Sequence, residues 1–175
     1  MTTSRFVSLI SLCLCSPLLA AEPDAAHEQT PKVEMRAPFV LTLHVDKEHY
    51  YEENIGEMPY VYENGIYLMK EDNFGVSLDI DGGKVRAVSY QPDLKKADMA
   101  FEFRQDVGAD GSSMMMLIIR NRTTYSLQMN ALMTVPGEKG QFETSIIPIQ
   151  PGLTNYESWP HPIAKLLLYD VRTGT

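Results

Sequence analysis

Hydrophobic and polar positions alternate along much of the chain from Pro38 onward. Every second residue is a large apolar one in the stretch 39–45, and the pattern repeats in 76–80. Because successive side chains of a β-strand point to opposite faces, this period of two is typical of strands with one buried face. No long window carries the helical period. We therefore predict an all-β, antiparallel β-sandwich of about eight or nine strands. Its candidate stretches, some of which merge, are 39–46, 59–63, 66–70, 74–80, 84–90, 98–105, 114–121, 124–134, 142–147 and 163–172.

Short turn sequences separate several of these stretches. They are Asn64-Gly65, Asp81-Gly82-Gly83, Asp110-Gly111 and Pro136-Gly137. Glycine and asparagine accept the positive φ angles that tight hairpins require. We expect each of these sequences to connect two antiparallel strands.

The segment 114–135 contains two strand-like runs around a short turn. MMMLIIRNR leads through TTYSL into LQMNALM, in which Leu127, Met129, Ala131 and Met133 share one face. A strand that ends in Asn-Arg-Thr and is followed by a second apolar strand resembles the paired strands of immunoglobulin-like domains in exported bacterial proteins. The resemblance covers about twenty residues, and the cysteine pair and core tryptophan of antibody domains are missing. It implies a fold class, since function does not follow from such a fold.

The first 21 residues have the pattern of a secretory signal peptide. Arg5 supplies the positive charge, an apolar run extends from Phe6 to Cys15, and Ala20-Ala21 provides a cleavage site. A lipoprotein signal is disfavoured because leucine precedes each cysteine. We predict a signal peptide at 1–21, a disordered leader at 22–37 and one β-sandwich domain at 38–175. The predicted location is the bacterial periplasm, with secretion as the second choice.

Both cysteines lie within the predicted signal peptide, so we expect a mature chain without disulfides or thiolate chemistry. The full chain has 15 Lys and Arg against 23 Asp and Glu, a net charge of −8. Nucleic-acid binding requires clustered basic residues, which this chain lacks, so we predict no nucleic-acid partner. No apolar run after residue 21 is long enough for a membrane span.

Enzyme signatures are few. There is no Gly-x-Ser-x-Gly sequence, and we predict a protein that is not an enzyme and needs no cofactor. His44 and His49 stand near acidic residues, and Met114, Met115 and Met116 follow one another. Imidazole and thioether groups bind copper, which makes periplasmic copper handling one alternative. The spacing matches no metal motif, and surface or core roles are favoured.

The segment 46–67 combines tyrosines with acids. It holds five of the nine tyrosines, and its first half carries five acids against one lysine. Tyrosine offers a large contact area at low entropic cost, and acids attract a basic protein. The alternative is a structural strand beside a solvated acidic loop. Candidate binding residues here are Tyr50, Tyr51, Glu52, Glu53, Tyr60 and Tyr62.

A second candidate is the loop 151–162, PGLTNYESWPHP. Its prolines favour an extended path that would display the single tryptophan. Tyr156, Glu157 and Trp159 are the candidate residues, for an interface or a sugar platform. The alternative is a tryptophan that closes one end of the sandwich.

These observations favour an exported binding protein with an inhibitor, immunity or accessory role toward a basic envelope protein. Carbohydrate or small-ligand binding, copper binding and a structural role in an envelope assembly remain alternatives. The sequence does not specify the oligomeric state.

Overall fold

The structure, a computed structural model, describes residues 33–174. The predicted signal peptide and residues 22–32 of the predicted leader lie outside this range. The described part is built from strands, and it includes no helix long and apolar enough to cross a membrane.

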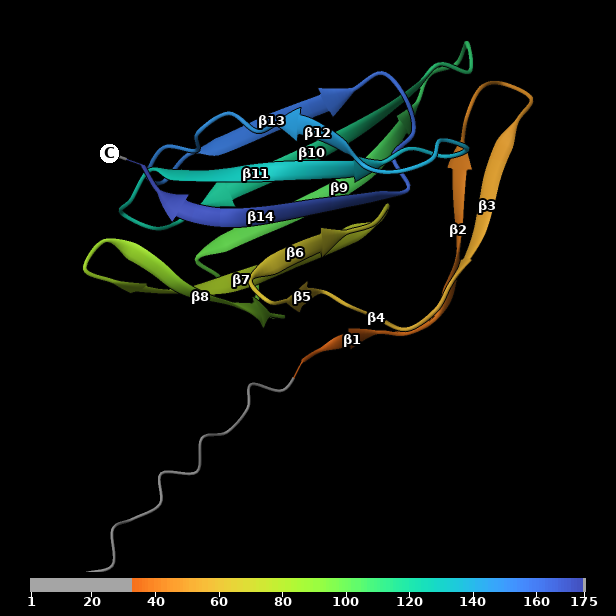
Figure 1. Cartoon of the computed structure of the whole chain (residues 1–175). Coiled ribbons are helices and arrows are strands. Elements are labelled where there is room, and N and C mark those ends of the chain that lie inside the picture. Colours follow the sequence, from red (N-terminus) through yellow and green to blue (C-terminus); the bar gives the residue numbers. More distant parts are fainter. Residues whose placement is uncertain (1–32, 175) are drawn as a thin grey trace, which may run out of the picture. The chain divides into compact units, whose positions relative to one another are not determined.

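Two five-stranded antiparallel sheets make up most of the described chain (Figure 1). The first sheet, in spatial order, consists of β13 (Thr154–Trp159), β10 (Ser113–Asn121), β9 (Met99–Val107), β7 (Asp72–Asp81) and β8 (Lys84–Gln91). The second consists of β12 (Phe142–Ser145), β11 (Leu127–Thr134), β14 (Lys165–Thr173), β6 (Gly65–Leu68) and β5 (Val61–Tyr62). The predicted fold class, an all-β antiparallel sandwich, is confirmed.

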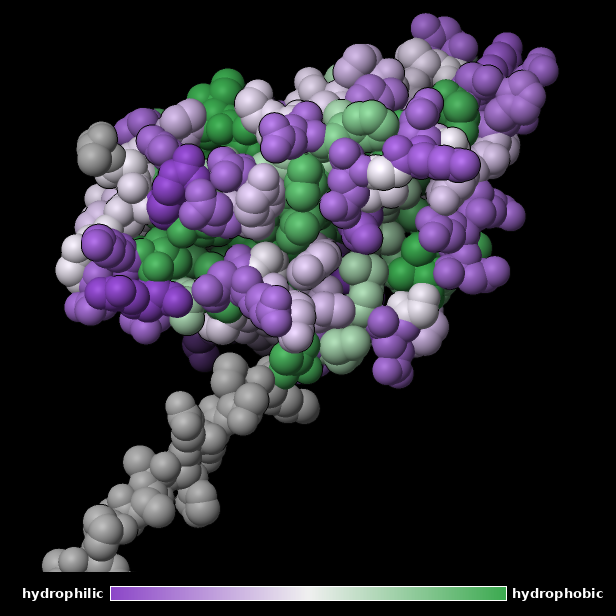
Figure 2. All heavy atoms as spheres, viewed as in Figure 1, coloured by the Kyte–Doolittle hydropathy of each residue, from purple (hydrophilic) through white to green (hydrophobic). Residues whose placement is uncertain are grey.

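The core lies between the inward faces of these sheets. Phe101, Phe103 and Leu117 of the first sheet are 1 % exposed or less, and so are Leu166 and Leu168 of the second. Each alternates with more exposed neighbours, as the period of two predicts. On the face shown in Figure 2, hydrophobic residues reach the surface only as separate patches among hydrophilic ones.

The four turn sequences do connect antiparallel strand pairs. The first turn is shifted by one residue, because Tyr62 pairs with Gly65 and the positive φ angles, 48° and 62°, fall on Glu63 and Asn64. The Asn64 side chain offsets part of this strain by accepting a hydrogen bond from the Val88 N–H at 2.9 Å.

The strands of the immunoglobulin-like resemblance are not paired with each other. β10 lies in the first sheet and β11 in the second, so the connection between them crosses from one sheet to the other. Asn121, at the end of β10, is 1 % exposed, and its amide donates to the main-chain oxygens of Tyr125 and Ile149. These bonds hold the chain in the crossover.

A short strand lies before the predicted domain boundary at Pro38. β1 (Met35–Arg36) pairs with β4 (Met58–Pro59). Arg36 is 6 % exposed and binds Asp72 at 2.6 Å, which fastens this segment to the core. The predicted leader therefore extends too far in its last residues.

Three strands were not predicted. They are β1, β13 and β3 (Tyr50–Ile55), of which the last pairs with β2 (Phe39–His44) in a separate hairpin. Together with the two-residue strands, they raise the number of described strands to 14. The β2–β3 hairpin stands across one end of the two sheets (Figure 1).

Candidate functional site

The β2 strand anchors the β2–β3 hairpin to the sandwich. Leu41 and Leu43 are 2 % exposed or less and belong to the core. The main-chain N–H and C=O of His44 bind the side chain of Gln105, at 3.0 and 2.8 Å. Lys70 Nζ donates to the Thr42 oxygen at 3.0 Å. The side of β2 that faces away from β3 is therefore occupied by side chains of the sandwich.

The hairpin tip is fixed by a second contact. The β9–β10 turn reaches it at Gly111, whose φ is 83°. A Cβ atom added at Gly111 would lie 2.5 Å from Lys47 Cβ, so only glycine allows this close approach. Within the tip, the Glu48 and His49 N–H groups donate to Asp46 Oδ1 at 2.8 and 2.9 Å. The bond from the Glu48 N–H is the largest cause of a lowered pKa of the Asp46 carboxyl, and a bond with the His49 ring is the second.

The outer strand β3 has a free edge. In an antiparallel pair, alternate residues direct their main-chain groups toward the partner strand and away from it. The Val45 N–H donates to the His49 oxygen, which fixes the residues that face the partner strand. The main-chain groups of His44 and Thr42 bond to side chains outside the hairpin, in agreement with this alternation. The N–H and C=O groups of Tyr50, Glu52 and Asn54 consequently point away from β2. Among the described residues they have no hydrogen-bond partner. We call these groups the β3 edge.

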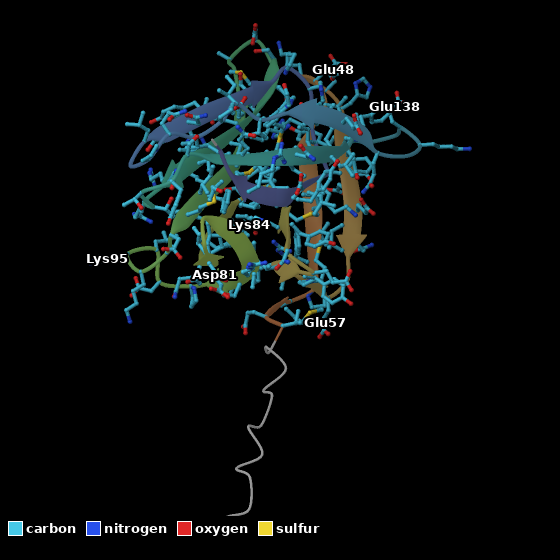
Figure 3. The ribbon with its side chains drawn as sticks, turned by 60° about the vertical axis from the view of Figure 1, so that its left-hand side comes forward. Glu48, Glu57, Asp81, Lys84, Lys95 and Glu138 are labelled. Carbon is cyan, nitrogen blue, oxygen red and sulfur yellow. The ribbon has the colours of Figure 1, made fainter. Side chains whose placement is uncertain are left out.

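The acids around β3 are not neutralised within the described part of the chain. Glu48, Glu52, Glu53 and Glu57 take part in none of its ion pairs. Figure 3 shows Glu48 and Glu57 near the two opposite ends of the hairpin. β3 is thus a strand whose unpaired main-chain groups lie in a negative field.

One face of the hairpin is exposed along both strands. Tyr50 is 55 % exposed and Val40 is 59 % exposed, and Glu52 and Asn54 are exposed beside them. His44 packs against Tyr50 with 4.5 Å between ring centroids. This face adds contact area to the β3 edge, and Val40, His44 and Asn54 are members that sequence reasoning missed. For Val40 and His44 the alternation in 39–45 is the signal, because it places them on the face opposite Leu41 and Leu43.

The opposite face carries Tyr51 and Glu53. The Tyr51 hydroxyl donates to Glu53 Oε2 at 2.7 Å, and this bond raises the pKa of the Tyr51 phenol. Tyr51 also packs against the core. The pair therefore stiffens β3 and leaves one oxygen of the Glu53 carboxylate without a side-chain donor among the described residues.

Tyr60 has a structural position and does not join this surface. Its ring stacks on Tyr90, with 4.6 Å between centroids, and the Arg36 guanidinium lies 4.2 Å from its centroid. Burial, with a smaller contribution from Tyr60, raises the pKa of the Tyr90 phenol. Tyr62 is 47 % exposed on β5, in the second sheet.

The candidate residues of 151–162 lie on β13 and divide into two kinds. Trp159 is 8 % exposed, and its Nε1 donates to Thr144 Oγ1 at 3.0 Å. Glu157 accepts a hydrogen bond from the Ile147 N–H at 2.9 Å. Both side chains tie β13 to the segment around β12, so the expected display of Trp159 is corrected. Tyr156, at 66 % exposure, is the member that faces outward.

A groove of about 570 Å³ lies beside β11. The β11–β12 ladder covers Asn130–Met133, and pairing resumes only at the bridge of Leu127 with Ile149. The chain between these points leaves β11 because β13 side chains hold Ile147. Polar residues that line the groove are Gln128, Asn130, Ser145, Tyr169 and Arg172.

The described residues contain no group of three or more His, Cys, Asp or Glu side chains placed to hold a metal ion. His49 binds Asp46 alone, at 2.8 Å. The methionines are dispersed, because Met115 is buried in the core and Met114 is 40 % exposed. The copper alternative gains no support from this geometry.

Comparison with protein-family models, curated proteins and solved structures finds no match to this chain. The described part is an antiparallel β-sandwich with an acidic hairpin at one end.

Proposed function

We propose that this protein is an exported, non-catalytic binding protein that recognises a basic protein of the bacterial envelope through the β2–β3 hairpin. The export and the periplasmic location rest on the signal-peptide pattern of residues 1–21. An inhibitor, immunity or accessory role suits a rigid sandwich that presents one charged element.

The observation that carries the proposal is the combination of exposure and unpaired charge on β3. Tyr50 and Val40 supply exposed contact area, and Glu52 and Glu53 supply charge that no described basic side chain neutralises. Opposite charge steers association, and tyrosine makes contacts at low entropic cost.

The test is affinity capture from the protein's own envelope fraction. The bait is the mature protein, beside a variant with Tyr50→Ala and Glu52→Gln. A matched control carries Tyr156→Ala and Asp79→Asn, which remove an exposed tyrosine on β13 and an exposed acid on β7. We expect the wild-type and control baits to capture a basic protein that the hairpin variant does not capture. About 0.5 M NaCl should release this protein from the bait. Equal capture by all three baits, or no capture at low salt, would contradict the proposal.

The groove beside β11 favours one second candidate, an uncharged saccharide. The amides of Gln128 and Asn130 and the Tyr169 phenol are groups that bind sugar hydroxyls and sugar faces. Trp159 binds Thr144, which also lines the groove, so its fluorescence would report occupancy. Titration with cell-wall oligosaccharides should change this fluorescence in the wild-type protein and not in Tyr169→Ala. If the fluorescence of the wild-type protein does not change during the titration, this candidate is excluded.

A further inference from the structure

We propose that the partner binds by strand addition. An extended basic segment pairs with the β3 edge and converts the β2–β3 hairpin into a three-stranded sheet. This inference rests on the proposed function and specifies how the partner is recognised.

The first argument is the main-chain geometry of β3. The strand is six residues long and is paired along its whole length with β2. Tyr50, Glu52 and Asn54 present three N–H and three C=O groups outward, and no described group bonds to them. An added strand would satisfy these groups in the alternating pattern of an antiparallel ladder.

The second argument comes from the other outer strands of the described sheets. β5 and β12 have two and four residues. β8 carries Lys84 and Arg86 and a β-bulge in its pairing with β7. β13, the fourth outer strand, has six residues, and its Asn155 and Glu157 side chains bond to the chain segment at Ile147. Shortness, basic side chains, bulges and covering segments are the usual protections of sheet edges. β3 shows none of them among the described residues, and its charges are acidic.

The third argument concerns the occupant. A second copy of the chain would bring Glu52 and Glu53 against the same acids, and like charges on facing strands repel. A strand with lysine or arginine at alternate positions has the complementary charge. The residue opposite Glu52 would carry its side chain on the same face as Glu52. A basic residue there would also lie within reach of the exposed Tyr50 ring.

The probe is a capped peptide of seven residues, Lys-Thr-Lys-Val-Lys-Thr-Lys, whose binding to the mature protein is measured by calorimetry at low salt. Two modified peptides are compared with it. One is N-methylated at the main-chain amides of the lysines, and the other is N-methylated at those of the threonines and the valine. With lysines opposite the β3 edge, the lysine amides make the new hydrogen bonds. We expect lysine methylation to weaken binding at least about tenfold, because it removes the donors of three hydrogen bonds and each such bond is worth about two- to tenfold in affinity. Methylation of the other amides should leave affinity unchanged.

Two protein variants test the same edge from the other side. Asn54→Pro removes an outward N–H without changing charge, and Asn54→Ala keeps that N–H. We expect Asn54→Pro to bind the peptide about two- to tenfold more weakly than Asn54→Ala, because both variants lose the Asn54 side chain and only the first loses the hydrogen-bond donor. Thermal melting shows whether Asn54→Pro folds, and the peptide comparison stands without it.

The outcomes separate the two proposals. If both methylated peptides bind as tightly as the parent, or if the parent does not bind, strand addition is overturned, and the capture experiment decides the function by itself. If sedimentation shows a dimer of the protein alone that Asn54→Pro abolishes, the occupant is a second copy and the basic partner is overturned. Loss of binding only with the lysine-methylated peptide and with Asn54→Pro supports strand addition.

Discussion

Arg36 and Asp72 form a buried ion pair near the first described residues, with side-chain exposures of 6 % and 11 %. Arg36 also donates to the Pro59 and Tyr67 oxygens, and Asp72 accepts from the Met69 N–H. Burial raises the pKa of the Asp72 carboxyl, and the attraction of Arg36 opposes this rise. The pair therefore holds β1 and β4 against the sandwich at a cost in desolvation.

Replacing Asp72 with asparagine should destabilise the protein strongly. The change leaves the Arg36 guanidinium buried without its counter-charge, and breaking a buried pair costs about 3–5 kcal/mol. Chemical denaturation measures the loss in the free energy of unfolding. Glu71→Gln is the matched control. The Glu71 side chain is 74 % exposed, so this change should alter the free energy of unfolding by less than about 0.5 kcal/mol. Equal effects of the two changes would show that the buried pair has no special role.

The Asp46 carboxyl should make the hairpin tip sensitive to acid. Hydrogen bonds from the Glu48 N–H and from His49 lower its pKa in the folded state. A lowered pKa contributes stability that is complete above the unfolded value of about 4 and is lost as the pH falls through the folded value. NMR should show the Glu48 and His49 amide signals shifting below about pH 4. The same signals should not shift in this window in Asp46→Ala, and a similar shift there would contradict the assignment.

At the scale of elements, β13 ties the two sheets together along one side. Glu157 and Trp159 bond to Ile147 and Thr144, and Asn155 donates to the Ile147 oxygen at 3.1 Å. The outward residue Tyr156 makes no such bond. β13 therefore has one structural face and one solvent face.

Two neighbouring substitutions on β13 should differ in effect. Glu157→Ala removes the acceptor of the Ile147 N–H and should lower the free energy of unfolding by about 1–2 kcal/mol. Tyr156→Ala should change it by less than about 0.5 kcal/mol, because this side chain is 66 % exposed. Thermal or urea unfolding of both variants measures the difference. A larger loss in Tyr156→Ala would mean that its ring, and not the cross-sheet bond, stabilises this side.

The sequence predicted strands where apolar and polar residues alternate, as in β2 and β7, and where an apolar run is continuous, as in β10. It missed β3, because YYEENI buries little surface and exists as a strand through its pairing with β2. It missed β13 because prolines flank it, although their extended path is what a strand also requires. Of the candidate residues, Tyr50 and Tyr156 lie at the surface, whereas Trp159 and Tyr60 are held by partners distant in sequence. Such contacts have no local signal.

At the scale of the whole molecule, net charge and fold have separate roles. The two sheets and β2 supply the fully buried core, and β3 adds only Tyr51 and Ile55, which pack against it while partly buried. The net charge of −8 favours encounter with basic molecules and keeps copies apart. This division allows a binding element to be changed with little effect on stability.

Amide hydrogen exchange resolved along β3 tests the central claim most directly, namely that an unpaired acidic strand edge binds a basic segment. In the free protein, the Tyr50, Glu52 and Asn54 amides should exchange fast, whereas those of Tyr51, Glu53 and Ile55, which face β2, should exchange slowly. With the lysine peptide bound, the three outward amides should become protected. Slow exchange at all six positions in the free protein, or no change on binding, would contradict the account.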